Sequence, residues 1–261
     1  MNRYQREIIY RPHSRNARRA WLIARFSLLV ALLTALLLRY HFISISEAKA
    51  VFFAIIAMCV ISCVFAVLAF MQIWRNDNRG LGKAVSGFVL ALAIMGLPLA
   101  LSLYHAITPG SVEATTDVVS PPPFSRSKAA FNLRGNWIAA QPEREALDRQ
   151  AEDNPDIISL ILDADPRSIT QQIQEYAHEH EWKMISNIAV GGRFGNGHLD
   201  FIAESSFLHL PIDVTARIIP TATGARVDIR SASRYPAFDS TNNVELVREL
   251  MENLLKGPPL G

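Results

Sequence analysis

Residues 50–74 read AVFFAIIAMCVISCVFAVLAFMQIW, a stretch of 25 residues without a charged side chain. At about 1.5 Å per residue, a helix of this length exceeds the roughly 30 Å hydrocarbon core of a bilayer. Every face of such a helix is apolar, which excludes a core helix of an ordinary soluble domain. The stretch therefore predicts a membrane-spanning helix.

Two further stretches predict spans on either side of this helix. Residues 84–107 form 24 residues without a charge, again long enough to cross the bilayer. Residues 20–38 are mostly apolar, although Arg25 lies one turn inside, where its side chain can extend back to the headgroups. Cys59 and Cys63 lie in the central span and are interpreted as small buried apolar residues. We therefore predict a basic tail over residues 1–19 and three transmembrane helices within residues 20–107.

The positions of the basic residues predict the direction of the three spans. Nine Lys and Arg residues lie in the N-terminal tail and in the loop of residues 75–83, whereas the loop between the first two spans holds only Arg39 and Lys49. Positively charged loops remain in the cytoplasm. The N-terminus is therefore expected in the cytoplasm and the C-terminal domain on the far side. In a bacterial chain this means a multi-pass protein of the inner membrane with a periplasmic domain.

Net charge separates the two parts of the chain and excludes one class of partner. Residues 1–107 carry 12 Lys and Arg against 3 Asp and Glu, a net of +9, whereas residues 108–261 carry 14 against 21, a net of −7. Such a surplus of negative charge excludes nucleic acid, because phosphate binding needs positive charge. We predict no cofactor and no metal site. The expected partners are the lipid bilayer and either an envelope protein or an anionic ligand, and the oligomeric state stays open.

The C-terminal part divides into a linker and a folded domain. Residues 108–130 predict a Pro-rich linker, because the prolines at 121–123 cannot join a helix or a central strand. Residues 131–261 predict a soluble α+β domain, with apolar runs that favour strands at 157–162, 182–190, 198–205, 211–219 and 225–234. Asp165 and Pro166 are typical of a helix start, and a second helix over 244–254 closes the domain. This order favours an antiparallel sheet with helices packed on one face.

The strand predicted over 225–234 carries the candidate binding residues. Alternate residues of a strand share a face, so Arg226, Arg230 and Arg234 point one way. Guanidinium forks suit carboxylate and phosphate groups, and three on one face suggest a site for an anion. The alternative is a solvated sheet face whose arginines pair with Asp213 and Asp228. The serines between the arginines face the core in this assignment, and no catalytic residue is predicted.

Several short motifs in the C-terminal part resemble one family. They are Asn154-Pro155-Asp156, Leu162-Asp163, and Asp228 to Arg234, which reads DIRSASR. This pattern resembles the family catalogued as domain of unknown function 1499, over about residues 115–255. The resemblance adds Asp239 and Asn243 to the ligand-binding candidates, since they fall where the family has a later Asp and Asn. It implies a bacterial envelope or plastid context and no established activity.

The sequence therefore leaves three functional hypotheses. The leading one is a non-enzymatic envelope protein whose periplasmic domain binds a ligand or a protein partner. The second is an enzyme acting on an anionic envelope substrate held by Arg230, Arg234 and Asp239. The third is a subunit of a membrane transport complex. A deep pocket lined by the arginines favours the enzyme or a small ligand, a flat arginine face favours protein contact, and a polar cavity among the spans favours transport.

Overall fold

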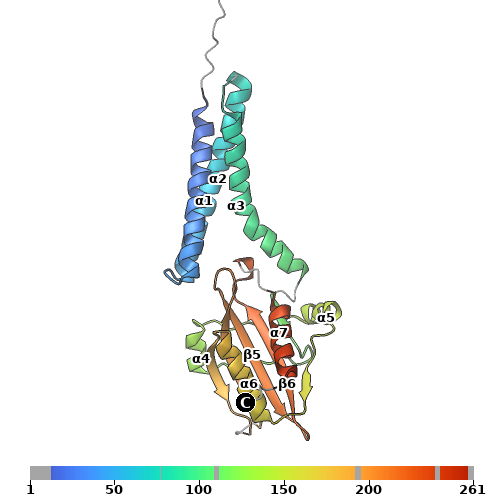
Figure 1. Ribbon diagram of the computed structural model, residues 1–261. Coiled ribbons are helices and arrows are strands. Elements are labelled where there is room, and N and C mark those ends of the chain that lie inside the picture. Colours follow the sequence, from blue (N-terminus) through green and yellow to red (C-terminus); the bar gives the residue numbers. More distant parts are fainter. Residues whose placement is uncertain (1–12, 77, 109–111, 192–194, 239–241, 258–261) are drawn as a thin grey trace, which may run out of the picture. The chain divides into compact units, whose positions relative to one another are not determined.

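The computed structural model describes residues 13–76, 78–108, 112–191, 195–238 and 242–257, and its elements are labelled in Figure 1. The chain divides into two compact units, Met1–Ala100 and Leu101–Gly261. Each unit is described by itself.

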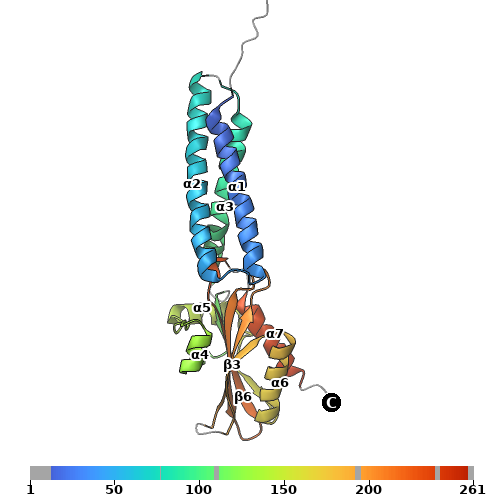
Figure 2. The ribbon, with the colours of Figure 1, turned by 90° about the vertical axis from the view of Figure 1, so that its left-hand side faces the viewer.

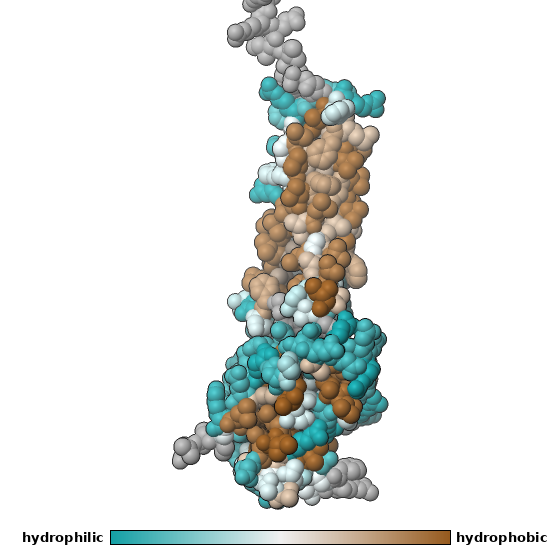
Figure 3. All heavy atoms as spheres, turned by 90° about the vertical axis from the view of Figure 1, so that its right-hand side faces the viewer, coloured by the Kyte–Doolittle hydropathy of each residue, from teal (hydrophilic) through white to brown (hydrophobic). Residues whose placement is uncertain are grey.

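The first unit contains two long helices and most of a third, whose last residues, 101–107, belong to the second unit. They are α1 (Arg15–Arg39), α2 (Ile45–Asn76) and α3 (Leu81–Ile107), which lie side by side in Figures 1 and 2. All three are long and apolar enough to cross a membrane, and at most 22% of any apolar window is buried within the protein. Most of their apolar side chains therefore face outward, and Figure 3 shows hydrophobic residues covering this part of the surface. The predicted region of three long apolar helices is confirmed.

Small residues let the three helices approach one another closely. Ala17, Ala20 and Ala24 of α1 are fully buried. The Ser62 hydroxyl of α2 donates a hydrogen bond of 2.8 Å to the backbone oxygen of Ala20. A Cβ atom at Gly87 of α3 would lie only 2.8 Å from the backbone of α1, so this position has no room for a side chain. Packing of this kind is typical of membrane helices, where small residues replace the hydrophobic driving force.

The second unit contains an antiparallel sheet, as predicted. Its strands follow the order β1-β6-β5-β4-β3, and the short β2 pairs with the other end of β6. The strands are β1 (Glu113–Thr115), β2 (Leu160–Leu162), β3 (Lys183–Ile188), β4 (Gly197–Glu204), β5 (Pro211–Pro220) and β6 (Ala225–Ser233). The helices are α4 (Lys128–Leu133), α5 (Arg144–Asp153), α6 (Pro166–Glu179) and α7 (Asn243–Leu255), with a short 3-10 turn, η2 (Pro236–Phe238).

The apolar core lies on one face of this sheet. Alternate residues of β4, β5 and β6, such as Phe201, Val214 and Ile229, are fully buried against α6 and α7. Both helices begin with a side-chain cap, from Asp165 for α6 and from Asn242 for α7. Figure 2 shows α6 and α7 on one side of the sheet and α4 on the other. The fold is therefore an α+β domain with its two long helices on one face.

The predicted linker is partly wrong. Residues 113–115 form β1, which pairs with residues 230–232 of β6, and Phe124 is 3% exposed. The prolines of this segment do exclude helix and central strand, but an extended chain is also suited to lying across a sheet. Its carbonyl oxygens accept hydrogen bonds from arginines of the sheet, at Pro122 and Ser120 for instance. The folded domain thus begins at residue 113 and not at 131.

Candidate functional site

The three predicted arginines share a face, and most of that face is closed to solvent. Arg226, Arg230 and Arg234 alternate along β6, and Arg217 lies opposite Asp228 on β5. Arg230 is 1% exposed, and Asp228 is fully buried. Residues 116–142, which include α4, cover this side of the sheet, and we call them the covering segment. The alternative of a solvated face is therefore wrong, because most of these side chains are buried. The pairing of the arginines with Asp213 and Asp228 that this alternative predicted is correct.

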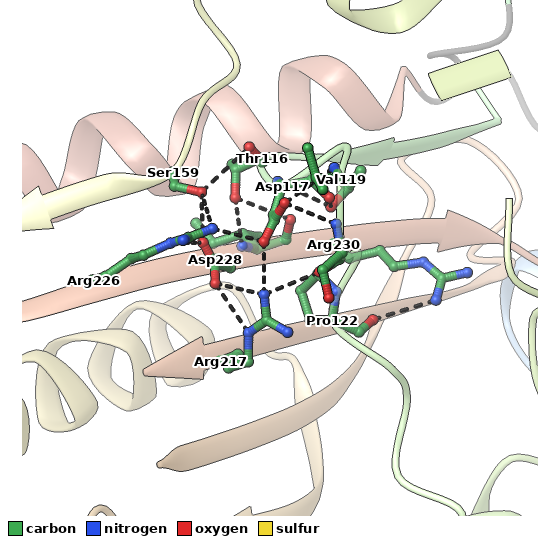
Figure 4. A network of polar contacts seen from close by, with 12 residues as sticks. Thr116, Asp117, Val119, Pro122, Ser159, Arg217, Arg226, Asp228 and Arg230 are labelled. Atoms are coloured by element: carbon green, nitrogen blue, oxygen red, sulfur yellow. Dashed lines mark hydrogen bonds and ion pairs between the residues drawn. The ribbon is translucent and has the colours of Figure 1, made fainter. Parts of the chain in front are cut away.

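The first group of polar contacts joins Arg217 and Arg226 to two aspartates (Figure 4). Asp228 lies 2.7 Å from Arg217 Nη2 and 2.8 Å from Arg226 Nε. Asp117 accepts from both guanidinium groups, at 2.9 Å and 2.6 Å. The hydrogen bond to Asp228 and the charge of Asp117 raise the pKa of Arg226. Ser159 donates to Asp228 at 2.6 Å and thereby fastens the segment before β2 to this group.

The second group surrounds Asp213. This buried carboxylate accepts from Arg134 Nε at 3.0 Å and from Arg234 Nη2 at 2.7 Å. Arg134 Nη2 also lies 3.3 Å from Asp200 Oδ1, but neither atom has a hydrogen-bond partner among the described residues. Their attraction is thus one of charge without a well-directed hydrogen bond. Trp137 stacks beside Arg234, with the guanidinium carbon 5.6 Å from the ring centre.

Arg230 lies between the two groups and binds the covering segment. Its Nε donates to Glu113 Oε1 at 2.5 Å, and its two terminal nitrogens donate to the backbone oxygens of Pro122 and Ala140. The Phe124 ring is 4.6 Å from the guanidinium carbon of Arg230. Burial raises the pKa of Glu113 above its ordinary value, although the adjacent Arg230 acts in the opposite direction.

The remaining two predicted residues do not join the arginines. Asn243 opens α7 on the core side of the sheet, where Ser231 donates to its Oδ1 at 2.5 Å and its Nδ2 donates to the backbone oxygen of Val112. It therefore fastens α7 to the sheet and does not face the arginine side. Asp239 lies outside the described residues. Of the five predicted ligand residues, the structure brings together Arg226, Arg230 and Arg234.

We call the complete set of paired charges the ionic layer. It consists of five arginines and five carboxylates: Arg134, Arg217, Arg226, Arg230, Arg234, Glu113, Asp117, Asp200, Asp213 and Asp228. Its formal charges cancel, so the layer offers an incoming anion no surplus of positive charge. Its most exposed arginine, Arg226, is 38% exposed and is already bound by two carboxylates.

The sequence reasoning missed half of this layer. Asp200 alternates with the apolar Leu199 and Phe201 on β4, and a carboxylate in such a strand is a signal of a buried partner. Glu113 belongs to β1, whereas Asp117 and Arg134 belong to the covering segment, which has no hydrophobic periodicity. Their partners are 79 to 117 residues away along the chain, so no local pattern identifies them.

One arrangement near the layer resembles a nucleophile with its base, but its geometry does not suit catalysis. Thr215 Oγ1 lies 3.2 Å from His198 Nε2, and Asp200 Oδ1 lies 3.4 Å from the same nitrogen. A catalytic histidine uses one ring nitrogen for the nucleophile and the other for the carboxylate. Thr215 is moreover fully buried, out of reach of a substrate. These three residues therefore act as part of the packed sheet.

A cavity of about 280 Å³ lies beside this layer. Gln150 of α5, which lines the cavity, binds β1 through its side-chain amide. Its Oε1 accepts from the backbone N–H of Thr115 at 2.9 Å, and its Nε2 donates to the backbone C=O of Thr115 at 2.8 Å. The residues that line the cavity are His105, Ala106, Val112, Glu113, Pro142, Glu143, Ala146, Leu147, Arg149 and Gln150.

Fold and site together define an α+β domain, with a buried ionic layer on one face of its sheet, in a chain that begins with three apolar helices. The sequence profile of the family described as "Protein of unknown function (DUF1499)" matches residues 113–254, more than half of the chain, so the chain belongs to this family. The predicted resemblance is thereby confirmed. The match begins at the first residue of β1 and ends in α7, so the family domain includes the covering segment. No curated protein and no solved structure matches the chain.

Proposed function

We propose that the chain is a multi-pass protein of the bacterial inner membrane that displays its C-terminal domain in the periplasm as a non-catalytic binding module. The observation that carries this proposal is the ionic layer. Arg226, Arg230 and Arg234 of this layer were the candidates for anion capture, and each is paired within the domain to a carboxylate. The layer thus stabilises the fold and holds the covering segment, which leaves binding to other parts of the surface.

The direction of the spans supports the periplasmic side. Nine basic residues lie in the tail and in the loop of residues 75–83, against Arg39 and Lys49 between the first two spans. Transport receives less support from the bundle. Of the buried polar side chains in the described part of residues 13–100, Ser14 bonds Gln72, and Ser27 and Ser62 donate to backbone oxygens within the bundle.

Labelling of single cysteines tests the proposed topology in a background with Cys59→Ala and Cys63→Ala. Glu145→Cys introduces a thiol on α5, where the native side chain is 82% exposed. Gly82→Cys is the matched control on α3, because a Cβ atom there meets nothing within 4 Å. A membrane-impermeant maleimide is applied to intact spheroplasts and, separately, to lysed ones.

We expect the thiol at 145 to react in intact spheroplasts and the thiol at 82 to react only after lysis. The reverse pattern would place the domain in the cytoplasm and overturn the proposal. Labelling of both sites in intact spheroplasts would also overturn it, since α3 would then not separate the two positions.

A further inference from the structure

The cavity of about 280 Å³ next to β1 has apolar walls and a charged rim. Ala106, Val112 and Leu147 belong to its apolar lining, while Glu113, Glu143 and Arg149 provide charge. A water molecule occupies about 30 Å³ of liquid, so the cavity has room for the equivalent of about nine waters. This volume suits a small polar group of roughly the size of a lipid headgroup and is too small for a long acyl chain.

Two of the residues that line this cavity belong to a helix that is also a candidate membrane span. His105 and Ala106, which line it, belong to the last turns of α3. The 20 residues Leu81–Ala100 of that helix lie in the first unit, and at about 1.5 Å per residue they match the roughly 30 Å hydrocarbon core. If α3 crosses the bilayer as proposed above, His105 and Ala106 emerge at the level of the headgroups.

The charged groups of the rim have free capacity for a ligand. Glu113 Oε1 binds Arg230, and within the described part of the chain no hydrogen bond reaches its other oxygen. Glu143 precedes α5 without a side-chain capping bond, and its side chain is exposed. Arg149 is about half exposed, and its Nη2 atom is 3.8 Å from Glu145. The rim thus combines two carboxylates, which attract a cation, with one guanidinium, which suits a phosphate.

We propose that this cavity binds the headgroup of a phospholipid from the adjacent leaflet that bears a primary ammonium, whose N–H groups can donate to carboxylates. The ammonium contacts the carboxylates of Glu113 and Glu143, and the phosphate contacts Arg149. A headgroup with a net negative charge is disfavoured, because it has no ammonium to pair with the carboxylate of Glu143. This inference rests on the proposed function, since it gives the binding module a ligand and assumes that α3 crosses the membrane.

Native mass spectrometry of the full chain tests the proposal. The protein is released from nanodiscs that contain equal amounts of phosphatidylethanolamine, phosphatidylcholine and phosphatidylglycerol, and the retained lipid is identified. Glu143→Lys reverses one rim charge at a side chain that holds no helix cap. Glu152→Lys is the matched control, because this exposed residue lies on the same helix but does not line the cavity. Ala146→Trp is a second variant that fills the cavity.

The wild-type protein is expected to retain one phosphatidylethanolamine per chain, with roughly tenfold less phosphatidylcholine and phosphatidylglycerol. Glu143→Lys and Ala146→Trp should each lower this retention by about tenfold, while Glu152→Lys should leave it unchanged. Equal retention of the three lipids would overturn the proposal, and so would full retention by the Ala146→Trp variant.

Two further measurements are needed. One distinguishes a lipid from a soluble ligand, and the other distinguishes failure of the headgroup site from failure of the proposed function. Tighter binding of water-soluble glycerophosphoethanolamine than of phosphatidylethanolamine would indicate a soluble ligand and overturn the assignment to a lipid. Cysteine labelling of spheroplasts that contain the same protein is read independently. Periplasmic labelling without selective lipid retention would reject the headgroup site alone, whereas cytoplasmic labelling would reject the proposed function.

Discussion

The two faces of the sheet in the C-terminal unit are both buried, yet they are buried by different means. On one face Phe201, Val214 and Ile229 pack against α6 and α7, with apolar atoms on both sides of the contact. On the other face the ionic layer lies beneath residues 116–142, and Asp200, Asp213 and Asp228 are fully buried there. The same strands supply both faces, because their side chains alternate.

The two faces restrict their partner segments with different specificity. An apolar contact is non-directional, so many side chains of similar volume satisfy it. A buried carboxylate is costly unless a partner with suitable geometry neutralises it. Of the apolar side chains of the covering segment, Phe124 and Ala130 are buried, whereas Val119, Phe131 and Leu133 are exposed. Arg230 binds the backbone oxygens of this segment and lies against the Phe124 ring. The ionic layer therefore fixes where residues 116–142 lie, while the apolar core holds the sheet to its helices.

The largest expected effect comes from removing a carboxylate that two arginines share. Asp213→Ala leaves Arg134 and Arg234 buried without their common partner. We expect the free energy of unfolding to fall by about 3–5 kcal/mol, as for other broken buried pairs. Urea unfolding of the full chain in detergent micelles measures this, with fluorescence from Trp137 and Trp182 after Trp21 and Trp74 are replaced by Phe.

The matched control for this change is the next residue on the same strand. Val214 points to the apolar face, and Val214→Ala removes two methyl groups from a fully buried position. Its expected cost is about 2 kcal/mol. If Asp213→Ala costs no more than Val214→Ala, the two faces do not differ in the way described.

Two conservative substitutions at adjacent residues of β6 compare the ionic face with the apolar face. Arg230→Lys keeps the charge but loses the fork that binds Glu113, Pro122 and Ala140 from three separate nitrogens. We expect a loss of about 2–3 kcal/mol, because buried acceptors lose their donors. Ile229→Val on the opposite face should cost only about 1 kcal/mol. The same unfolding measurement compares them, and equal losses would show that the fork geometry is unimportant.

The apolar face was predictable from the sequence, and the reason is its period. Apolar runs predicted the strands at 198–205, 211–219 and 225–234, alternation assigned the inner side of the last one, and Asp165-Pro166 marked the start of α6. The three long helices were likewise evident from uninterrupted apolar runs. Each of these signals lies within a window of a few residues to about 25, which is the scale on which a single sequence is informative.

The polar face was only half predictable, because its partners lie far apart in the chain. The alternation of arginines on β6 placed Arg226, Arg230 and Arg234 on one face, but nothing local indicated that residues 113–142 cover them. The prolines at 121–123 suggested a linker, since a stiff extended segment has the same composition whether it is solvated or packed. A buried ionic layer and a solvated arginine face thus look alike in sequence.

The smallest expected effect concerns an ion pair of the same chemistry that lies outside the layer. Arg248 of α7 donates to Asp156 at 2.8 Å and to Glu245 at 2.6 Å, but the two carboxylates are about half exposed. Solvent screens such a pair, so Arg248→Ala should lower the free energy of unfolding by at most about 1 kcal/mol at neutral pH. The hydrogen bond from Arg248 holds the pKa of Asp156 below its ordinary value of 3.8. A carboxyl with a lowered pKa binds fewer protons in the folded state, so its pairing adds stability above that ordinary value.

The difference between the wild type and Arg248→Ala should therefore be full at neutral pH and disappear as the pH falls below 3.8, through the lowered pKa of Asp156. It should also shrink in 1 M salt, where the screening length is only about 3 Å, while the cost of Asp213→Ala should persist because both sides of that pair are buried. Unfolding curves at several pH values and salt concentrations measure both effects. A loss at Arg248 as large as that at Asp213 would mean that burial is not what separates the ionic layer from an ordinary surface pair.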